Sequence, residues 1–201
     1  MVQSGERHGH WLDVSPTAKI QIDSIATLGP EGTSSENAAK HLWNARGPGS
    51  EPVVQLYDTY EKAGEALKAG LASHLVAANA YSAINIFYMD PSLSLVIAFL
   101  FDTPPYGLAT SNPAKVPREV RVASHPAPVP LIGELLPASY ALAGILSADS
   151  TSAAALKAQR SEIDLALTTQ PAAAVHKLQF ISKTRTISML WSVFTVRQPQ
   201  S

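Results

Sequence analysis

The chain has 201 residues, of which 46% are hydrophobic and 15% are charged, and its formal net charge is −1. This composition supports a folded core and argues against extensive disorder. The absence of cysteine excludes disulfides and thiolate sites, and the lack of a basic block argues against nucleic acid as the main partner.

No run approaches the roughly 18 apolar residues that a membrane span requires. The N-terminus also lacks the apolar core of a secretory signal peptide. We therefore expect a globular, cytoplasmic protein with no membrane partner.

Short apolar segments alternate with helical segments along most of the chain. Residues 1–22 read as a loosely ordered tail, and the final "RQPQS" reads the same way. The predicted strands cover 24–28, 53–57, 74–78, 93–101, 119–123, 140–146, 163–169 and 187–196. Alternation of strands and helices predicts an α/β fold with mainly parallel sheets.

Three junctions place small hydroxyl residues where a strand gives way to a helix. Thr33 and Glu36 have the spacing of a capping box, and similar residues occur in 124–128 and 149–155. Helix N-termini offer unpaired N–H donors and a partial positive charge, and in α/β sheets they gather at one edge. Several of them facing one another suit a small anion with two charges.

The common catalytic and cofactor motifs are absent from the sequence. The glycine loop at 29–33 is not followed by Lys-Ser/Thr, and there is no dinucleotide glycine pattern, H-E-x-x-H or G-x-S-x-G. We therefore expect neither a metal nor another cofactor.

The blocks "LGPEGTSS", "DTYEKAGEAL", "ASHP", "STSAAA" and "IDLALTT" resemble, in this order, the catalytic domain of prephenate dehydratases. The resemblance covers 25–196 and implies a two-lobed fold like that of type II periplasmic binding proteins, with prephenate between the lobes. It implies one lobe over 23–98 plus 175–201 and a second over 99–174. A regulatory ACT domain usually follows in that family, and this chain ends without one.

A closer resemblance is to the non-aromatising prephenate decarboxylases, through "TLGPEGTSSENAAK", "AYSAINIFYM", "DTPPYGLA", "SHPAPVPLI", "STSAAA" and "SMLWSVF". This resemblance implies loss of carbon dioxide from prephenate with the ring hydroxyl retained, in specialised pathways such as those to bacilysin and the aeruginosins. Leu190, Trp191 and Ser192 stand where dehydratases have Thr-Arg-Phe. Because leucine cannot hydrogen-bond a leaving hydroxyl, dehydration is expected to be impaired.

The resemblance and the junctions together suggest how the substrate is held. We expect Gly32, Thr33 and Ser34, with Thr151 and Ser152, to supply N–H and hydroxyl donors to its carboxylates. For Thr151 and Ser152 the alternative is simple helix capping.

The proton donor is left open at this stage. His125 either carries a proton or orients the substrate, or it only bonds its own loop. Asp102 is either a buried general acid or a turn cap. A bound water or the substrate's own carboxyl group is a further candidate.

Several other side chains are expected near the substrate. Tyr81, a candidate catalytic residue, and Tyr88 either shape the ring pocket or form a core stripe on one helix face. Trp191 is expected to pack against substrate or core rather than perform chemistry. The remaining expected binding residues are Asn79, Thr103, Ser124 and Leu190.

Three alternatives remain from the sequence: a prephenate dehydratase, a solute-binding protein without catalysis, and a non-catalytic pathway scaffold. A homodimer is left open as the assembly.

Overall fold

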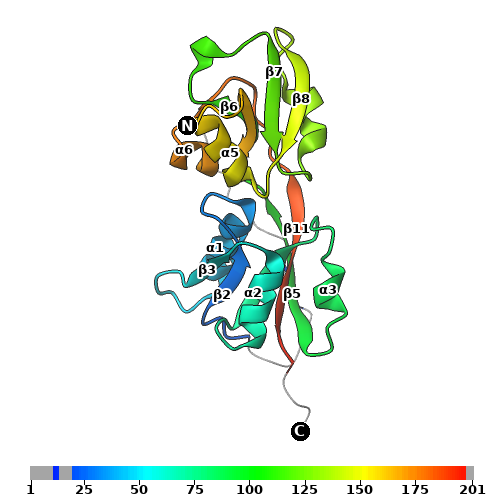
Figure 1. Cartoon of the computed structure of the whole chain (residues 1–201). Coiled ribbons are helices and arrows are strands. Elements are labelled where there is room, and N and C mark those ends of the chain that lie inside the picture. Colours follow the sequence, from blue (N-terminus) through cyan, green and yellow to red (C-terminus); the bar gives the residue numbers. More distant parts are fainter. Residues whose placement is uncertain (1–10, 14–19, 198–201) are drawn as a thin grey trace.

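Two β-sheets divide the chain into two lobes, each with helices packed beside its sheet (Figure 1). The computed structural model describes residues 11–13 and 20–197. The expected tail residues 1–10 and 14–19, and residues 198–201 at the other end, lie outside this description. The fold has the two-lobed α/β architecture that the family resemblance implies.

The first sheet has the strand order β1-β5-β11-β4-β2-β3. Its strands are β1 (Trp11–Asp13), β2 (Ile25–Leu28), β3 (Val54–Tyr57), β4 (His74–Ala78), β5 (Leu93–Asp102) and β11 (Ser188–Val196). The helices of this lobe are α1 (Ser34–Arg46), α2 (Tyr60–Lys68) and α3 (Asn85–Tyr88). Thr33 and Thr59 begin α1 and α2 by accepting a hydrogen bond from a first-turn N–H, which fixes where each helix starts.

The second sheet has the strand order β10-β6-β9-β7-β8. Its strands are β6 (Tyr106–Thr110), β7 (Glu119–Ser124), β8 (Ala141–Ser147), β9 (Leu165–Thr169) and β10 (Gln179–Phe180). Its helical segments are the 3-10 turns η1 (Pro113–Lys115) and η2 (Val129–Leu131), with α4 (Ile132–Leu135), α5 (Thr151–Gln159) and α6 (Gln170–Val175).

Two of the five strand pairings in the first sheet and two of the four in the second are parallel, so the expectation of mainly parallel sheets is wrong. The trios β4-β2-β3 and β9-β7-β8 are parallel, whereas the other neighbours pair antiparallel. The physical reason is the route of the chain, which leaves the first lobe at the end of β5 and returns along β11. These two crossing strands therefore run in opposite directions (Figure 1).

The crossings between the lobes lie later in the chain than the sequence suggests. β5 stays in the first sheet as far as Asp102, because it pairs with β11 along its length up to Ser188. On the return, Gln179 and Phe180 pair with β6 of the second sheet. The expected boundaries at 98/99 and 174/175 are therefore each displaced toward the C-terminus.

Part of the expected N-terminal tail is ordered against the first lobe. Trp11 pairs with Phe99 in the β1–β5 register, and its ring stacks on those of Phe99 and His41. Ile22 is fully buried in the core of the same lobe. The prediction of a loosely ordered segment is therefore wrong for these residues, because aromatic stacking holds Trp11 and burial in the core holds Ile22.

Each lobe has its own hydrophobic core. The first lobe packs α1 and α2 against its sheet through side chains such as Leu42 and Leu75. The second lobe has two clusters, an alanine-rich one around α5 and another around Leu108 and Leu135. None of the helices in the described ranges could span a bilayer.

Candidate active site

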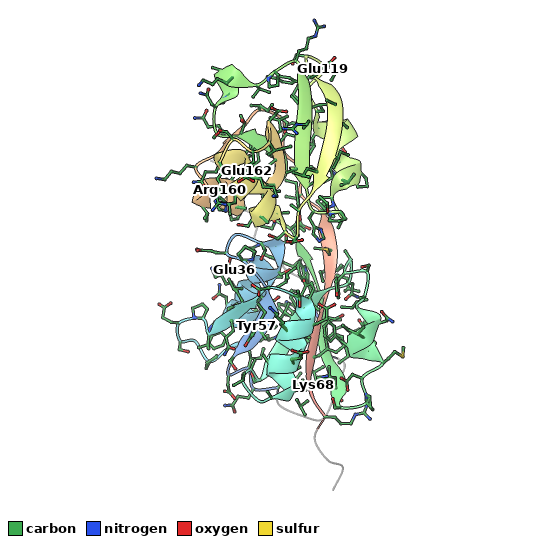
Figure 2. All side chains as sticks on the ribbon, viewed as in Figure 1. Glu36, Tyr57, Lys68, Glu119, Arg160 and Glu162 are labelled. Carbon is green, nitrogen blue, oxygen red and sulfur yellow. The ribbon has the colours of Figure 1, made fainter. Side chains whose placement is uncertain are left out.

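A cavity of about 640 Å³ lies between the lobes and is lined by residues from both of them. This volume is within the range of typical small-ligand sites. The lining comes from the ends of β2 and β4, the starts of α1, α2 and α5, the loop after β7, and the two crossing segments. In Figure 2 Glu36, on the first turn of α1, lies on the side of the first lobe that faces the second.

Three helix N-termini converge on this cavity. α1 and α2 present their first turns from the first lobe, and α5 presents its first turn from the second. The Ser35 hydroxyl and the Tyr60 hydroxyl, 2.6 Å apart, tie the starts of α1 and α2 together. The two earliest amides of a helix have no acceptor within it, so this arrangement offers N–H donors and positive dipole ends to an anion.

The side chains around the cavity include no lysine or arginine among the described residues. They do include three carboxylates, those of Asp58, Glu61 and Asp149. A bound anion therefore depends on backbone N–H groups and neutral hydroxyls rather than on an opposite charge.

Gly32 and Thr33 do not offer the donors that the sequence suggests. The Gly32 N–H already donates to the Glu36 carboxylate at 2.7 Å, and Gly32 does not line the cavity. The Thr33 hydroxyl donates to the Leu28 carbonyl at 3.0 Å and accepts from the Glu36 N–H. The expected donor role is therefore wrong for Gly32 and for the Thr33 side chain, because local structure already uses both groups.

Ser34 lines the cavity and also joins the lobes. Its hydroxyl lies 3.0 Å from that of Tyr106, the first residue of β6 in the second sheet. Burial raises the pKa of Tyr106, so this hydroxyl stays protonated at neutral pH. Beside it, the first-turn amides of Ser34 and Ser35 have no partner in the described chain. These amides are the donors that α1 offers.

Tyr60, Glu61 and Tyr81 form one wall of the cavity. The Tyr60 ring contacts the Tyr81 ring at 4.9 Å between centroids, and the Ala78 N–H donates to the Tyr60 hydroxyl at 3.2 Å. The Tyr81 hydroxyl donates to the Glu61 carboxylate. Desolvation first, and then Glu61, raise the pKa of Tyr81 to about 12, while the bond from Tyr81 lowers the pKa of Glu61. At neutral pH this wall therefore holds a neutral phenol and an ionised carboxylate.

His125 lines the cavity from the second lobe, in the loop after β7. Its Nδ1 accepts the Ala127 N–H at 3.3 Å, so the neutral ring carries its proton on Nε2. Desolvation lowers the pKa of His125, although Asp149 opposes the shift. The loop leads into the 3-10 turn η2 and the one-turn helix α4 at Ile132, so no α-helix begins directly after Ser124 as expected.

At the start of α5 the capping residue is Ser150, which accepts the Ala153 N–H at 3.0 Å. Thr151 lines the cavity, and its hydroxyl has no hydrogen-bond partner in the described chain, so it is available to a ligand. Ser152 instead contacts the His176 ring at 3.0 Å, away from the cavity. The structure therefore excludes capping for both Thr151 and Ser152 and keeps only Thr151 near the ligand space.

On β11 the residues that line the cavity are Met189 and Trp191, which alternate with Leu190. Trp191 is fully buried, and its Nε1 donates to the Phe101 carbonyl at 3.1 Å. Leu190 is 40% exposed and does not line the cavity. The expectation that Leu190 contacts the substrate is therefore wrong, because adjacent strand residues point to opposite faces.

Thr103 lines the cavity where the two crossing segments meet. It exchanges backbone and side-chain hydrogen bonds with Ile187, the residue before β11. Asp102, one residue earlier, does not line the cavity. This placement gives no support to Asp102 as the general acid.

Three further expected residues lie outside the cavity lining. Asn79 and Tyr88 both contact Ser192, through hydrogen bonds of 2.6 and 2.7 Å. Ser124 is fully buried and donates to the His125 carbonyl. Tyr88 and Tyr81 do not share a helix, because α3 covers only Asn85–Tyr88. The structure therefore gives these three residues structural contacts rather than a place beside a ligand.

The sequence interpretation missed most of the lining residues, among them the polar side chains of Ser35, Tyr60, Glu61, Tyr106 and Ser150. A signal existed for Tyr60 and Glu61, since they follow Thr59 at a strand-to-helix junction like the one at Thr33. Tyr106 had no such signal, because its place depends on how the second lobe sits against the first.

Comparisons with known proteins are consistent with this geometry. The chain is 36% identical over 185 residues to the prephenate decarboxylase of Planktothrix agardhii, covering 89% of this chain and 91% of that protein. It is 34% identical over 195 residues to the prephenate decarboxylase of Bacillus subtilis strain 168, covering 91% and 94%. The chain belongs to the prephenate decarboxylase family. No protein-family profile matches the sequence.

Solved structures show the same fold at lower identity. The prephenate dehydratase of Arthrobacter aurescens in complex with L-Phe matches with a TM-score of 0.67 and 15% identity, covering 87% of this chain and 61% of that one. The periplasmic VFT2 domain of Bordetella pertussis BvgS matches with a TM-score of 0.50 and 19% identity, covering 88% and 81%. This decarboxylase-family chain therefore has the two-lobed fold of periplasmic binding proteins.

Proposed function

We propose that this chain is a lyase that removes carbon dioxide from prephenate without aromatising the ring. The product keeps the ring hydroxyl and is a dihydro-4-hydroxyphenylpyruvate. The observation that carries the proposal is the identity of 34–36% over most of the chain with relatives named prephenate decarboxylases. The cavity between the lobes supports it, because its volume and donors suit a small dicarboxylate.

Prephenate carries a carboxylate and a pyruvyl arm on one quaternary ring carbon and a hydroxyl across the ring. The free amides of Ser34 and Ser35 and the hydroxyl of Thr151 lie on opposite lobes and are suited to hold the pyruvyl carboxylate between them. A neutral set of donors fixes the substrate without neutralising the carboxylate that has to leave.

The departing carboxylate needs a poorly solvated position, because desolvation disfavours the charged ground state more than the neutral carbon dioxide that forms. Leu28, Ile187, Met189 and Trp191 supply apolar surface to the cavity. When the carbon–carbon bond breaks, its electron pair enters the ring, and one ring carbon must take up a proton. Of the two side chains considered as proton donors, His125 lines the cavity and Asp102 does not, which favours His125 between them.

The test is to incubate the purified protein with prephenate near pH 8, where spontaneous aromatisation is slow, and to follow the products by proton NMR. We expect carbon dioxide and a dihydro-4-hydroxyphenylpyruvate that still carries its ring hydroxyl. Heat-denatured protein is the control for the uncatalysed reaction.

Two results would contradict the proposal. Phenylpyruvate as the enzymatic product would indicate a dehydratase. Prephenate that binds but persists unchanged would indicate a binding protein.

We further propose that the product enters a specialised-metabolite pathway of the kind that leads to bacilysin or the aeruginosins. Support for this step comes from the sequence resemblance to decarboxylases of those pathways. Feeding isotope-labelled prephenate to the producing cells, with and without the gene, tests it through the labelled end product.

A further inference from the structure

The cavity wall formed by Tyr60, Glu61 and Tyr81 offers a ligand hydrogen-bond acceptors but no proton donor. Glu61, on the first turn of α2, lines the cavity, and its carboxylate accepts the proton of the Tyr81 hydroxyl. The Tyr81 proton is thereby directed at Glu61 and not at a ligand. An ionised carboxylate has only acceptor sites. A ligand group on this wall therefore has to be a donor.

Prephenate has one group that meets this requirement. Its two carboxylates are anions and would be repelled by Glu61, whereas its ring hydroxyl is neutral and has an O–H to donate. We infer that Glu61 accepts a hydrogen bond from the ring hydroxyl of the substrate and thereby keeps this hydroxyl from leaving. This inference rests on the proposed function. It names the residue that decides whether the ring hydroxyl is retained, as in a decarboxylase, or lost, as in a dehydratase.

The chemistry explains why an acceptor at this position matters. In either reaction the carbon–carboxylate bond breaks and its electron pair moves into the ring. The pair then either forms a C–H bond with an incoming proton or expels the oxygen across the ring, which requires a proton on that oxygen so that water departs. A carboxylate that draws the hydroxyl proton toward itself disfavours the second path, and the first path remains.

Glu61 is better suited to this task than the other two carboxylates of the cavity. Asp58 and Glu61 are both exposed, but Asp58 forms an ion pair with Lys62 at 2.8 Å, whereas Glu61 forms no ion pair with another described residue. Asp149 lies in the second lobe, where its charge acts on His125. The partners of Glu61 are neutral: the Tyr81 hydroxyl first, and then its own backbone N–H and the Thr59 hydroxyl, lower the pKa of Glu61 and so support its ionised form. A carboxylate has about four acceptor sites, so these three donors leave room for one more from a ligand.

Glu61→Gln is the decisive variant, because it keeps the shape and changes an acceptor into a donor. The Tyr81 hydroxyl still donates to the amide oxygen, so the amide NH₂ faces the substrate hydroxyl and assists its departure. With prephenate, we expect the ratio of phenylpyruvate to dihydro product to rise at least tenfold over the wild-type ratio. Glu65→Gln, one turn along the same helix and outside the cavity, is the matched charge control and is expected to keep the wild-type ratio.

Glu61→Asp retains a carboxylate and is expected to restore the hydroxyl-retaining product. A ratio of products does not depend on the amount of folded enzyme, so a merely structural role of Glu61 would not change it. An unchanged ratio in folded Glu61→Gln protein overturns the inference, and so does complete loss of turnover, since loss of carbon dioxide does not need this carboxylate. If the wild-type protein itself leaves prephenate unchanged, the proposed function fails, which is a separate outcome.

Discussion

At the scale of single residues, Gly32 and Thr33 show that hydrogen bonds within the chain can occupy groups that a sequence motif suggests for a ligand. The Glu36 carboxylate lies within reach of the Gly32 N–H, and the Thr33 hydroxyl lies between the Glu36 N–H and the Leu28 carbonyl. An intramolecular partner at such short range is always present, whereas a substrate is bound only part of the time. These groups therefore fix the loop, and the neighbouring free amides remain for the anion.

His74, the first residue of β4, provides a prediction at the same scale. It is 5% exposed, and burial lowers its pKa to about 4. Between pH 6.5 and 4 the unfolded chain binds a proton at this site and the folded chain does not. The free energy of unfolding should therefore have its full value above pH 6.5. It should fall by about 3 kcal/mol as the pH drops from 6.5 to 4.

The measurement is urea unfolding at pH 7 and pH 4.5, for the wild type and for His74→Gln. The variant should lose less stability on acidification, by roughly the amount just given, because glutamine does not titrate. Equal losses in both proteins would contradict the assignment to His74.

At the scale of elements, the site depends on where helices begin. α1 and α2 follow adjacent parallel strands, β2 and β3, so their N-termini lie at the same edge of the first sheet. α5 follows β8 at the corresponding edge of the second sheet, and the lobes bring the two edges together. A helix that begins directly after a strand thus supplies backbone N–H donors without any charged side chain.

Thr33→Val tests this arrangement in α1. Valine neither accepts the Glu36 N–H nor donates to the Leu28 carbonyl, so loss of the cap should lower the free energy of unfolding by about 1 kcal/mol. The Michaelis constant for prephenate should rise, because the first-turn amides lose their fixed direction. Urea unfolding and steady-state kinetics measure the two effects.

Thr33→Ser keeps both hydrogen bonds and should behave like the wild type. An unchanged Michaelis constant in Thr33→Val would show that the start of α1 does not hold the substrate.

At the scale of the whole molecule, the lobes touch beside the cavity at the loop before α1. The Thr169 hydroxyl donates to the Gly32 carbonyl at 2.8 Å, and a Cβ on Gly32 would lie 2.8 Å from the Cα of Ala172. Thr169 and Ala172 belong to the second lobe and Gly32 to the first. The absence of a side chain at Gly32 is what lets the two backbones approach, and this contact sets how far the cleft is closed.

Gly32→Ala should therefore separate the lobes, in addition to its strain at φ +86. We expect a larger radius of gyration in small-angle X-ray scattering and a Michaelis constant for prephenate at least tenfold higher. Gly49→Ala is the matched control, since Gly49 has a similar φ of +81 and open space around its Cβ position. If both variants behave alike, backbone strain rather than lobe contact explains the effect.

Two points concern the whole molecule: the homodimer stays open, and the cytoplasmic location stays a prediction.

Strand and helix positions, the helix caps and the family were accessible from the sequence, because each rests on local pattern or on blocks preserved in order. Thr59, for example, marks the start of α2 by its own side chain, and the strand at 74–78 is observed with the expected bounds. Which side chains meet in the cleft was not accessible. Tyr106 reaches Ser34, and Leu190 turns away while Trp191 lines the cavity, only because of the path by which β5 and β11 cross between the lobes. Tertiary structure decides such contacts because they join residues far apart in the chain, whose spacing carries no signal of their proximity.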